Sequence, residues 1–243
     1  MTDTYRFADT VVAVDALYPA VHAYCSAYRC TGTPALTVRI TQADIDAERR
    51  KSADEDRAEG RPVHAFADDY LETLAVYRKI AEWMPQRDTV LLHGSAVAVD
   101  GAAYLFTAKS GTGKSTHTAL WQAAFGSRAV MINDDKPLLR IAPDSVTVFG
   151  TPWDGKHRRS SNCAAPLHAM CILERAAQTQ VVPISASQAM PLLLQQVYRP
   201  ADPVALAATL RLLDRLTQTV PLYRMGCNMA PSAAEIAYEA MKG

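Results

Sequence analysis

The chain has 243 residues, of which 49% are hydrophobic and 21% are charged, a composition typical of an ordered globular protein with a real core. Disorder would need fewer apolar residues and more net charge. Lys and Arg together number 25, as do Asp and Glu, so the formal net charge is zero. A general nucleic-acid binder normally carries a basic surplus, so this balance argues against nucleic acid as a partner.

The sequence contains none of the usual signs of a membrane segment, an export signal or a disulfide framework. No apolar run approaches the ~20 residues that a membrane span needs. The first residues, "MTDTYRFADT", lack the basic region and apolar run of a signal peptide. We therefore expect a cytoplasmic protein with no membrane partner. The five cysteines are scattered without a C-x-x-C pair, which favours buried free thiols over disulfides or a zinc site.

The N-terminal part of the chain predicts a small α+β region. "YRFADTVVAV" and "ALTVRI" have the apolar pattern of strands. Thr41, with Asp44 three residues later, predicts a capped helix that runs through Glu48. The segment "ERRKSADEDRAEGR" is dense in charge, so we expect an exposed helix end or a loop there. Apolar residues at helical spacing predict a further helix over 68–84.

From about Thr89 the pattern becomes that of an α/β domain. Two apolar strands flank Asp100-Gly101, which predicts a hairpin, and its second strand, "AAYLFTA", leads directly into a glycine-rich loop and then a helix. Strands are predicted at "RAVMIN", "PLLRI", "VTVFG", "LHAMCILE", "VVPIS" and "PLYRMGCN". Helices are predicted over 187–198, over 202–217 with an Asp202 cap, and after a Ser232 capping box. We therefore predict an α+β extension at 1–88 and an α/β domain at 89–243.

The stretch "TAKSGTGKSTHTALW" is typical of a phosphate-binding loop, G-x-x-x-x-G-K-[ST]. Ala108 stands where that pattern has its first glycine. Backbone N–H groups curled around a triphosphate, with the positive end of the following helix, would hold the phosphates. The lysine would reach the β- and γ-phosphates, and the serine after it would offer its hydroxyl to Mg²⁺. The residues predicted to bind nucleotide are Ser110, Gly111, Thr112, Gly113, Lys114, Ser115 and Thr116.

Two adjacent carboxylates, Asp134 and Asp135, follow the strand "RAVMIN". Phosphoryl transfer needs a metal ion near the phosphates and a group that accepts the proton of the attacking hydroxyl. Side chains alternate along a strand, so one carboxylate could face the metal and the other the substrate. "NDDKP" is also typical of a solvated turn. The glycine loop upstream makes the catalytic interpretation the better one.

The segment "TPWDGKHRR" places four basic residues in a row, Lys156, His157, Arg158 and Arg159. A charge run is most often a solvated loop. Phosphoryl transfer, however, benefits from a cation on the transferring group, and arginine suits bidentate phosphate contact. We therefore predict a catalytic contribution from the two arginines. Asp154 could supply a further carboxylate to the metal.

"LLHGSAVAVDGAAYLFTAKSGTGKST", followed by "MINDD", resembles the catalytic domain of the HPr kinase/phosphorylase family. Both have a His-Gly strand, a hairpin, an S-G-x-G-K-S loop and a downstream Asp-Asp. The loop is also similar to that of ATP-dependent phosphoenolpyruvate carboxykinase, whose core fold is related. The resemblance covers His93 to Asp135 and, more loosely, continues to Asn162. It implies an α/β P-loop core with a mixed β-sheet and flanking helices, with the small N-terminal extension in addition.

The resemblance also implies an activity: an ATP-dependent kinase that uses Mg²⁺. Lys114 and Ser115 would bind the phosphates and Mg²⁺, Asp134 would be the general base and Asp135 a metal ligand. His93 would lie beside the active site, or else be a half-buried strand histidine. The acceptor would be a hydroxyl group of a protein, a precursor peptide or a small molecule.

Several alternatives stay open at this level. The R-G-x-G segment that follows the aspartates in HPr kinases is missing, which argues against HPr as the substrate. No feature of the sequence separates ATP from GTP. A nucleotide-sensing partner protein without phosphotransfer is the main competing interpretation, and a homo-oligomer is possible.

Overall fold

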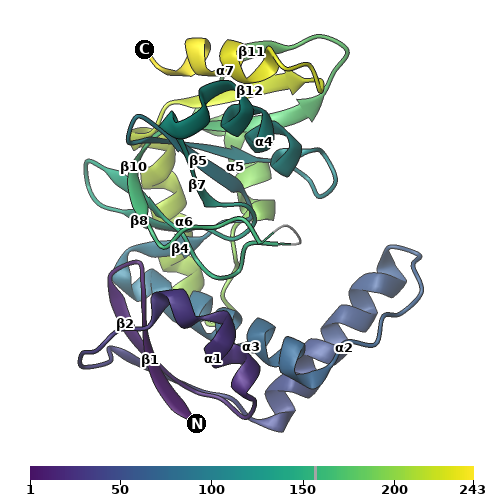
Figure 1. Ribbon diagram of the computed structural model, residues 1–243, viewed down its shortest axis with the longest axis vertical. Coiled ribbons are helices and arrows are strands. Elements are labelled where there is room, and N and C mark those ends of the chain that lie inside the picture. Colours follow the sequence, from purple (N-terminus) through teal and green to yellow (C-terminus); the bar gives the residue numbers. More distant parts are fainter. Residues whose placement is uncertain (156–157) are drawn as a thin grey trace. The chain divides into compact units, whose positions relative to one another are not determined.

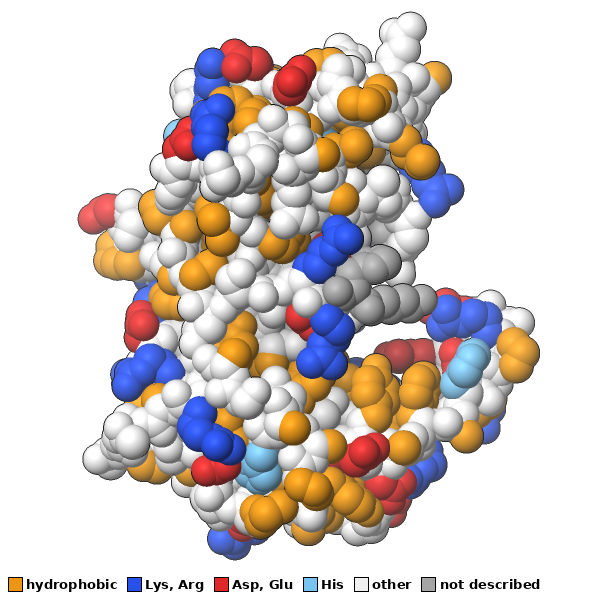
Figure 2. All heavy atoms as spheres, viewed as in Figure 1, with side chains coloured by type: hydrophobic (Ala, Val, Ile, Leu, Met, Phe, Trp, Pro, Cys, Tyr) orange, Lys and Arg blue, Asp and Glu red, His pale blue; other side chains and the backbone are white. Residues whose placement is uncertain are grey.

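A computed structural model describes residues 1–155 and 158–243 of the chain. These residues form two compact units, Met1–Ala81 and Glu82–Gly243. The division falls within one helix, whereas the boundary predicted from the sequence was at residue 88. None of the helices in the described ranges is both long and apolar enough to cross a bilayer. Figure 2 shows basic and acidic side chains interspersed over the face in view, in keeping with their equal totals.

The first unit contains a three-stranded sheet, and helices follow its strands in the chain. The strands are β1 (Thr2–Phe7), β2 (Thr10–Asp15) and β3 (Leu36–Arg39). β1 pairs antiparallel with β2, and β3 pairs parallel with the other edge of β2. The helices are α1 (Pro19–Tyr24), the 3-10 turn η1 (Ser26–Tyr28), α2 (Gln42–Ala58) and α3 (Asp68–Trp83). The expected α+β character of this region is therefore present.

Helix α2 differs from the sequence-based expectation, because it continues to Ala58 instead of ending near Glu48. The segment "ERRKSADEDRAEGR" has almost no large apolar residues, which is why a helix end or a loop is expected there. Alanine, glutamate, arginine and lysine are nevertheless good helix formers, and the segment is rich in them. Arg49 forms an ion pair with Asp46 one turn away, the kind of contact that supports an exposed helix.

Helix caps show mixed agreement with the predictions. The Thr41 capping box is confirmed: the Thr41 backbone N–H donates to the Asp44 carboxylate over 2.8 Å. The cap of the helix that begins at Pro203 is also confirmed, since the Asp202 carboxylate accepts from the next-turn backbone N–H over 2.8 Å. The predicted Ser232 capping box is wrong. Ser232 itself has helical backbone angles, φ −66° and ψ −12°, and its side chain makes no cap hydrogen bond.

The second unit is built on a mixed sheet in which, among the described residues, nine strands pair. Its strands are β4 (Thr89–Leu91), β5 (Ser95–Val99), β6 (Ala102–Thr107), β7 (Ala129–Asn133), β8 (Leu138–Ile141), β9 (Val146–Phe149), β10 (Ala164–Arg175), β11 (Gln180–Pro183) and β12 (Leu222–Cys227). The spatial order is β4-β8-β9-β10-β6-β5-β7, with β12 on β10 and β11 on β12. The β5–β6 hairpin is confirmed, and its turn residues Asp100 and Gly101 have φ values of 53° and 84°.

The long strand β10 organises this sheet. Its first part, 164–166, pairs with β9, and its later part, 170–175, pairs with β12, while β6 lies along its opposite edge. β10 pairs parallel with both β6 and β12. The carboxyl ends of these three strands therefore lie together along one edge of the sheet, the edge formed by strand ends. Ligands of open α/β sheets bind at such an edge. The glycine loop begins there, directly after β6.

Helices cover both faces of this sheet, and successive residues of each central strand face alternate sides. On β6, Ala103 and Leu105 belong to the core formed with α5 (Ala186–Gln196) and α6 (Pro203–Thr219). Tyr104 and Phe106 belong to the core formed with α4 (Lys114–Phe125) and α7 (Ala233–Met241). Figure 1 shows α4 and α7 together at one end of the unit and α5 and α6 running behind the strands. The second unit is therefore a mixed α/β fold with a mixed sheet and flanking helices, as predicted.

The remaining helical pieces are two short 3-10 turns, η2 (Met84–Arg87) and η3 (Gly126–Arg128). Each leads into a strand, η2 into β4 and η3 into β7.

Candidate functional site

The glycine loop connects the end of β6 to the first turn of α4, as the sequence predicts. Gly111 has φ +76° and Gly113 has φ +118°, both in the left-handed region that side chains disfavour. A Cβ at either position would meet no atom within 4 Å. Backbone conformation, and not lack of space, is therefore what requires glycine here. Gly113 precedes the first helical residue, so the free N–H groups of α4 open onto the loop.

Ala108, at the position of the missing first glycine, is a core residue. Its side chain is fully buried in the core that contains Phe106 and Trp121. Its φ is not positive, so alanine fits without backbone strain. Its carbonyl oxygen accepts a hydrogen bond from Lys114 Nζ over 3.3 Å. The departure from the usual pattern thus leaves the loop geometry intact.

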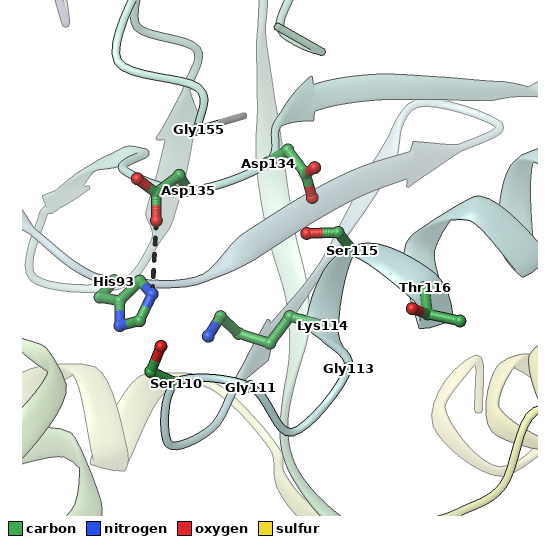
Figure 3. A pocket seen from close by; sticks show the side chains of 10 residues that line it. All are labelled: His93, Ser110, Gly111, Gly113, Lys114, Ser115, Thr116, Asp134, Asp135 and Gly155. Carbon is green, nitrogen blue, oxygen red and sulfur yellow. Dashed lines mark ion pairs between the residues drawn. The ribbon is translucent and has the colours of Figure 1, made fainter. Parts of the chain in front are cut away.

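A cavity of about 440 Å³ lies over the loop. It is lined by His93, Ser110, Gly111, Gly113, Lys114, Ser115, Thr116, Asp134, Asp135 and Gly155. Only Gly155 among these was not a predicted site residue. Figure 3 shows the Lys114 side chain extending across this cavity toward His93 and Ser110, with the two aspartates on the opposite wall. The predicted residue Thr112 does not line this cavity.

The Asp134 carboxylate is oriented by a chain of two hydroxyl groups, those of Ser95 and Thr118. Asp134 follows β7 directly and is 5% exposed. Its Oδ1 accepts a hydrogen bond from Ser95 Oγ on β5 over 2.7 Å, and Ser95 Oγ lies 2.9 Å from Thr118 Oγ1 on α4. In Figure 3 the Asp134 carboxylate faces the Ser115 hydroxyl. Strand β5, helix α4 and the acidic turn are thereby tied together beneath the cavity.

Asp135 lies beside His93 and Lys136 at the cavity. Its Oδ1 lies 3.3 Å from His93 Nε2, and its Oδ2 contacts Lys136 Nζ. Burial raises the pKa of Asp135, but the hydrogen bond from His93 and the charge of Lys136 outweigh burial and hold that pKa at about 2. Asp135 is therefore ionised at neutral pH. His93 is fixed on its other side, where Nδ1 lies 2.7 Å from Gln196 Oε1 on α5.

Asn133 shapes the turn that presents both aspartates. It is fully buried, and its Oδ1 accepts from the backbone N–H groups of Asp135 at 2.9 Å and Lys136 at 2.6 Å. Its Nδ2 donates to the Thr151 carbonyl oxygen over 2.9 Å. "NDDKP" thus turns the chain, but it is not the solvated turn of the alternative interpretation, because Asn133 and Asp134 are buried. The turn directs both carboxylates into the cavity.

Lys114 is 8% exposed, and its ammonium group forms no ion pair within the described ranges of the chain. Burial lowers its pKa, while the carboxylates of Asp135 and Asp134 act in the opposite direction. Its Nζ hydrogen-bonds only weakly to the Ala108 carbonyl, at 3.3 Å. A cation in this position is suited to an anion that enters the cavity.

The structure describes only part of the basic segment. Lys156 and His157 lie outside the described residues. The Arg158 side chain is 60% exposed and its Nε lies 3.4 Å from Asp154 Oδ1. Arg159 is also exposed, and neither arginine is among the described residues that line the cavity. Their predicted catalytic contribution therefore stays a prediction.

Gly155 and Asp154 connect this segment to the site. Gly155 has φ +73°, and a Cβ there would lie 3.2 Å from Asp135 Cβ, so the backbone passes directly against that carboxylate. Asp154 is 4% exposed and accepts from Ser160 Oγ over 2.9 Å. Burial raises the pKa of Asp154, with a smaller contribution of the same sign from Asp134.

Three side chains that position the site were not identified from the sequence: Ser95, Asn133 and Gln196. Asn133 had a usable signal, because asparagine before two aspartates and a proline is typical of a turn closed by its own side chain. Ser95 and Gln196 act on residues 39 and 103 positions away in the chain, and no local pattern marks them.

No protein-family profile and no curated protein sequence matches the chain. Among solved structures, the chain is similar to the Hpr(Ser) kinase/phosphatase from Coxiella burnetii, with 10% sequence identity and a TM-score of 0.34. The alignment covers 63% of this chain and 99% of that one. This distant likeness concerns the fold alone.

Proposed function

We propose that this protein is an ATP-dependent kinase, related to HPr kinase, that transfers the γ-phosphate to a hydroxyl acceptor. One observation carries the proposal: the Lys114–Ser115 loop and two adjacent carboxylates line the same cavity. A protein that only binds nucleotide needs no second carboxylate there. The motifs from His93 to Asp135 support the family assignment, and the weak structural likeness has no part in it.

The phosphates of the donor fit the loop for electrostatic reasons. The N-terminal N–H groups of α4 are unpaired within the helix and carry its positive end, which favours an anion. Lys114 adds a buried charge beside them. The positive φ values of Gly111 and Gly113 turn the backbone around the cavity.

The cavity also has the donor atoms that Mg²⁺ prefers. Among the described residues, no three His, Cys, Asp or Glu side chains form a metal cage. Mg²⁺ does not need one, because it usually binds one or two carboxylates and completes its shell with water and phosphate oxygens. Ser115 and Asp134, which face each other in Figure 3, would hold it. The ion would neutralise charge on the phosphates.

This geometry favours exchanging the two roles assigned to the aspartates from the family resemblance. Asp134 faces Ser115 and suits the metal, whereas Asp135 lies beyond Lys114 with His93 and suits the acceptor hydroxyl. With a pKa of about 2, Asp135 is a weak proton acceptor while it pairs with Lys136. Negative charge brought in by a triphosphate would raise that pKa and compete for the lysine.

The acceptor we propose is a serine or threonine of a protein or peptide, with a small-molecule hydroxyl as the alternative. The test is to incubate the protein with γ-labelled ATP, Mg²⁺ and panels of both acceptor types. Label should appear on one acceptor class, require Mg²⁺ and be lost in Lys114→Met. Tight ATP binding without turnover toward any acceptor would instead support a nucleotide-sensing protein. Absence of ATP binding would overturn the proposal entirely.

A further inference from the structure

A second cavity, of about 650 Å³, adjoins the first on the other side of the glycine loop. Gly111, Gly113 and Thr116 line both cavities. The outer wall of the second cavity comes from the residues at and just after the ends of β10 and β12. Neither phosphate binding nor proton transfer uses this space. Its volume is within the range of small-molecule sites, roughly 300–1,000 Å³.

The location of this cavity restricts what could occupy it. β6, β10 and β12 are parallel, and their carboxyl ends form one edge, with Arg175 of β10 in register with Cys227 of β12. Ligands of α/β sheets lie outside such an edge. A molecule bound here would be in contact with the loop that holds the phosphates. The part of a nucleotide that must lie next to its phosphates is the nucleoside.

His117, in the wall of this cavity, has a buried ring nitrogen without a partner among the described residues. It is 2% exposed, lies on the first turns of α4 and lines the cavity wall. Trp121 Nε1–H can only donate, and it donates to His117 Nε2 over 3.0 Å. His117 therefore carries its hydrogen on Nδ1, and Nδ1 has no hydrogen-bond partner among the residues that the structure describes. A buried donor without a partner is unfavourable unless a ligand or water supplies an acceptor.

Two flexible side chains at the wall suit an aromatic ring. Arg175, the last residue of β10, is exposed and donates from its guanidinium to the Gly111 carbonyl oxygen. Met229, which follows β12, is 77% exposed. A guanidinium plane and a thioether both make favourable contacts with aromatic faces. Cys227 adds apolar surface to the same wall.

We propose that this second cavity binds the nucleoside of the nucleotide whose phosphates lie in the glycine loop, with a purine base against Arg175 and Met229. His117 lies in the wall beside the nucleoside. This inference rests on the proposed function, because it assumes that the loop binds a triphosphate. It adds the recognition of the nucleoside, which the loop itself does not provide.

The experiment compares two ligands that share their phosphates, ATP and inorganic triphosphate, each with Mg²⁺, by calorimetry on the full chain. ATP should bind at least tenfold more tightly. Met229→Ala should weaken ATP binding several-fold and leave triphosphate binding unchanged. The double substitution of Arg175 and Met229 by alanine should weaken ATP binding about tenfold or more. Arg128→Ala, an exposed arginine paired with Asp100 away from both cavities, is the matched control and should change neither affinity.

The outcomes separate this inference from the proposed function. Because Arg175→Ala also removes the bond to Gly111, its effect on triphosphate shows how far the loop itself is disturbed. Equal binding of ATP and triphosphate to the unmodified protein would overturn the nucleoside site and leave the phosphate site standing. Unchanged ATP affinity after both substitutions would overturn the nucleoside site as well. If neither ligand binds, the inference and the proposed function fail together.

Discussion

Ser95 on β5 donates its hydroxyl hydrogen to Asp134 Oδ1 over 2.7 Å, and both side chains are buried at the cavity over the glycine loop. This bond fixes the orientation of a carboxylate that follows a different strand. Side chains that orient metal-binding groups in this way typically change metal affinity or activity by about 10- to 100-fold when removed. Ser95 is therefore a positioning residue for Asp134.

Ser95→Ala should raise the Mg²⁺ concentration needed for half-maximal activity by about tenfold or more, because Asp134 loses its fixed orientation. The measurement is a Mg²⁺ titration of phosphotransfer at saturating ATP. Thr118→Val is the control, since it removes the neighbouring hydroxyl but keeps the Ser95–Asp134 bond. Equal effects of the two substitutions would mean that only packing is disturbed.

Lys114→Met should weaken ATP binding by about 30-fold or more, because removing one partner of a buried charge pair costs about 2–5 kcal/mol. The same substitution should leave the melting temperature unchanged or raise it, because Lys114 is 8% exposed and its charge is poorly compensated. Calorimetry and thermal melts check the two expectations. A lower melting temperature with unchanged ATP affinity would show that Lys114 has a structural role instead.

Asp134→Asn and Asp135→Asn should differ in how Mg²⁺ affects them. If Asp134 holds the metal with Ser115, its substitution should shift the Mg²⁺ dependence and be partly overcome by excess Mg²⁺. If Asp135 acts on the acceptor hydroxyl, its substitution should lower kcat about 10²- to 10⁴-fold at any Mg²⁺ concentration. The reverse pattern would restore the roles that the family resemblance implies.

The parts of this fold that could be predicted are those that depend on a few consecutive residues. Asp100-Gly101 predicted the β5–β6 hairpin because a two-residue turn with positive φ needs those residue types. The glycine loop was recognisable for the same reason. Helix α2 was predicted too short, since absence of apolar residues was given more weight than helix propensity over 49–58.

The supports of the site could not be predicted, because each joins distant parts of the chain. His93 meets Gln196 across 103 positions, and Ser95 meets Asp134 across 39. Neither pair follows a period of helix or strand. Such contacts depend on how the strands are ordered in the sheet, and the branching at β10 is not encoded in any local pattern.

Cys25 should make the stability of the first unit depend on alkaline pH. Burial raises the pKa of its thiol from 9 to about 12. The folded state therefore disfavours the thiolate, and the stabilisation is complete below pH 9 and lost as pH rises from about 9 to 12. At pH 10.5 the free energy of unfolding should be lower by about 2 kcal/mol because of this thiol. Urea unfolding of the unmodified chain should show this decline relative to Cys25→Ala, and parallel curves would contradict it.

Gly155→Ala should impair activity more than it impairs folding. The substitution places a side chain at φ +73° and brings its Cβ to 3.2 Å from Asp135 Cβ. The backbone cost is about 1 kcal/mol, and the contact should displace Asp135 from His93. Gly60→Ala is a matched control, because Gly60 has φ +67° with no atom within 4 Å of a Cβ. Both variants should lose similar stability in unfolding experiments, whereas only Gly155→Ala should lose phosphotransfer; equal activities would show that the close approach of this loop to Asp135 has no functional consequence.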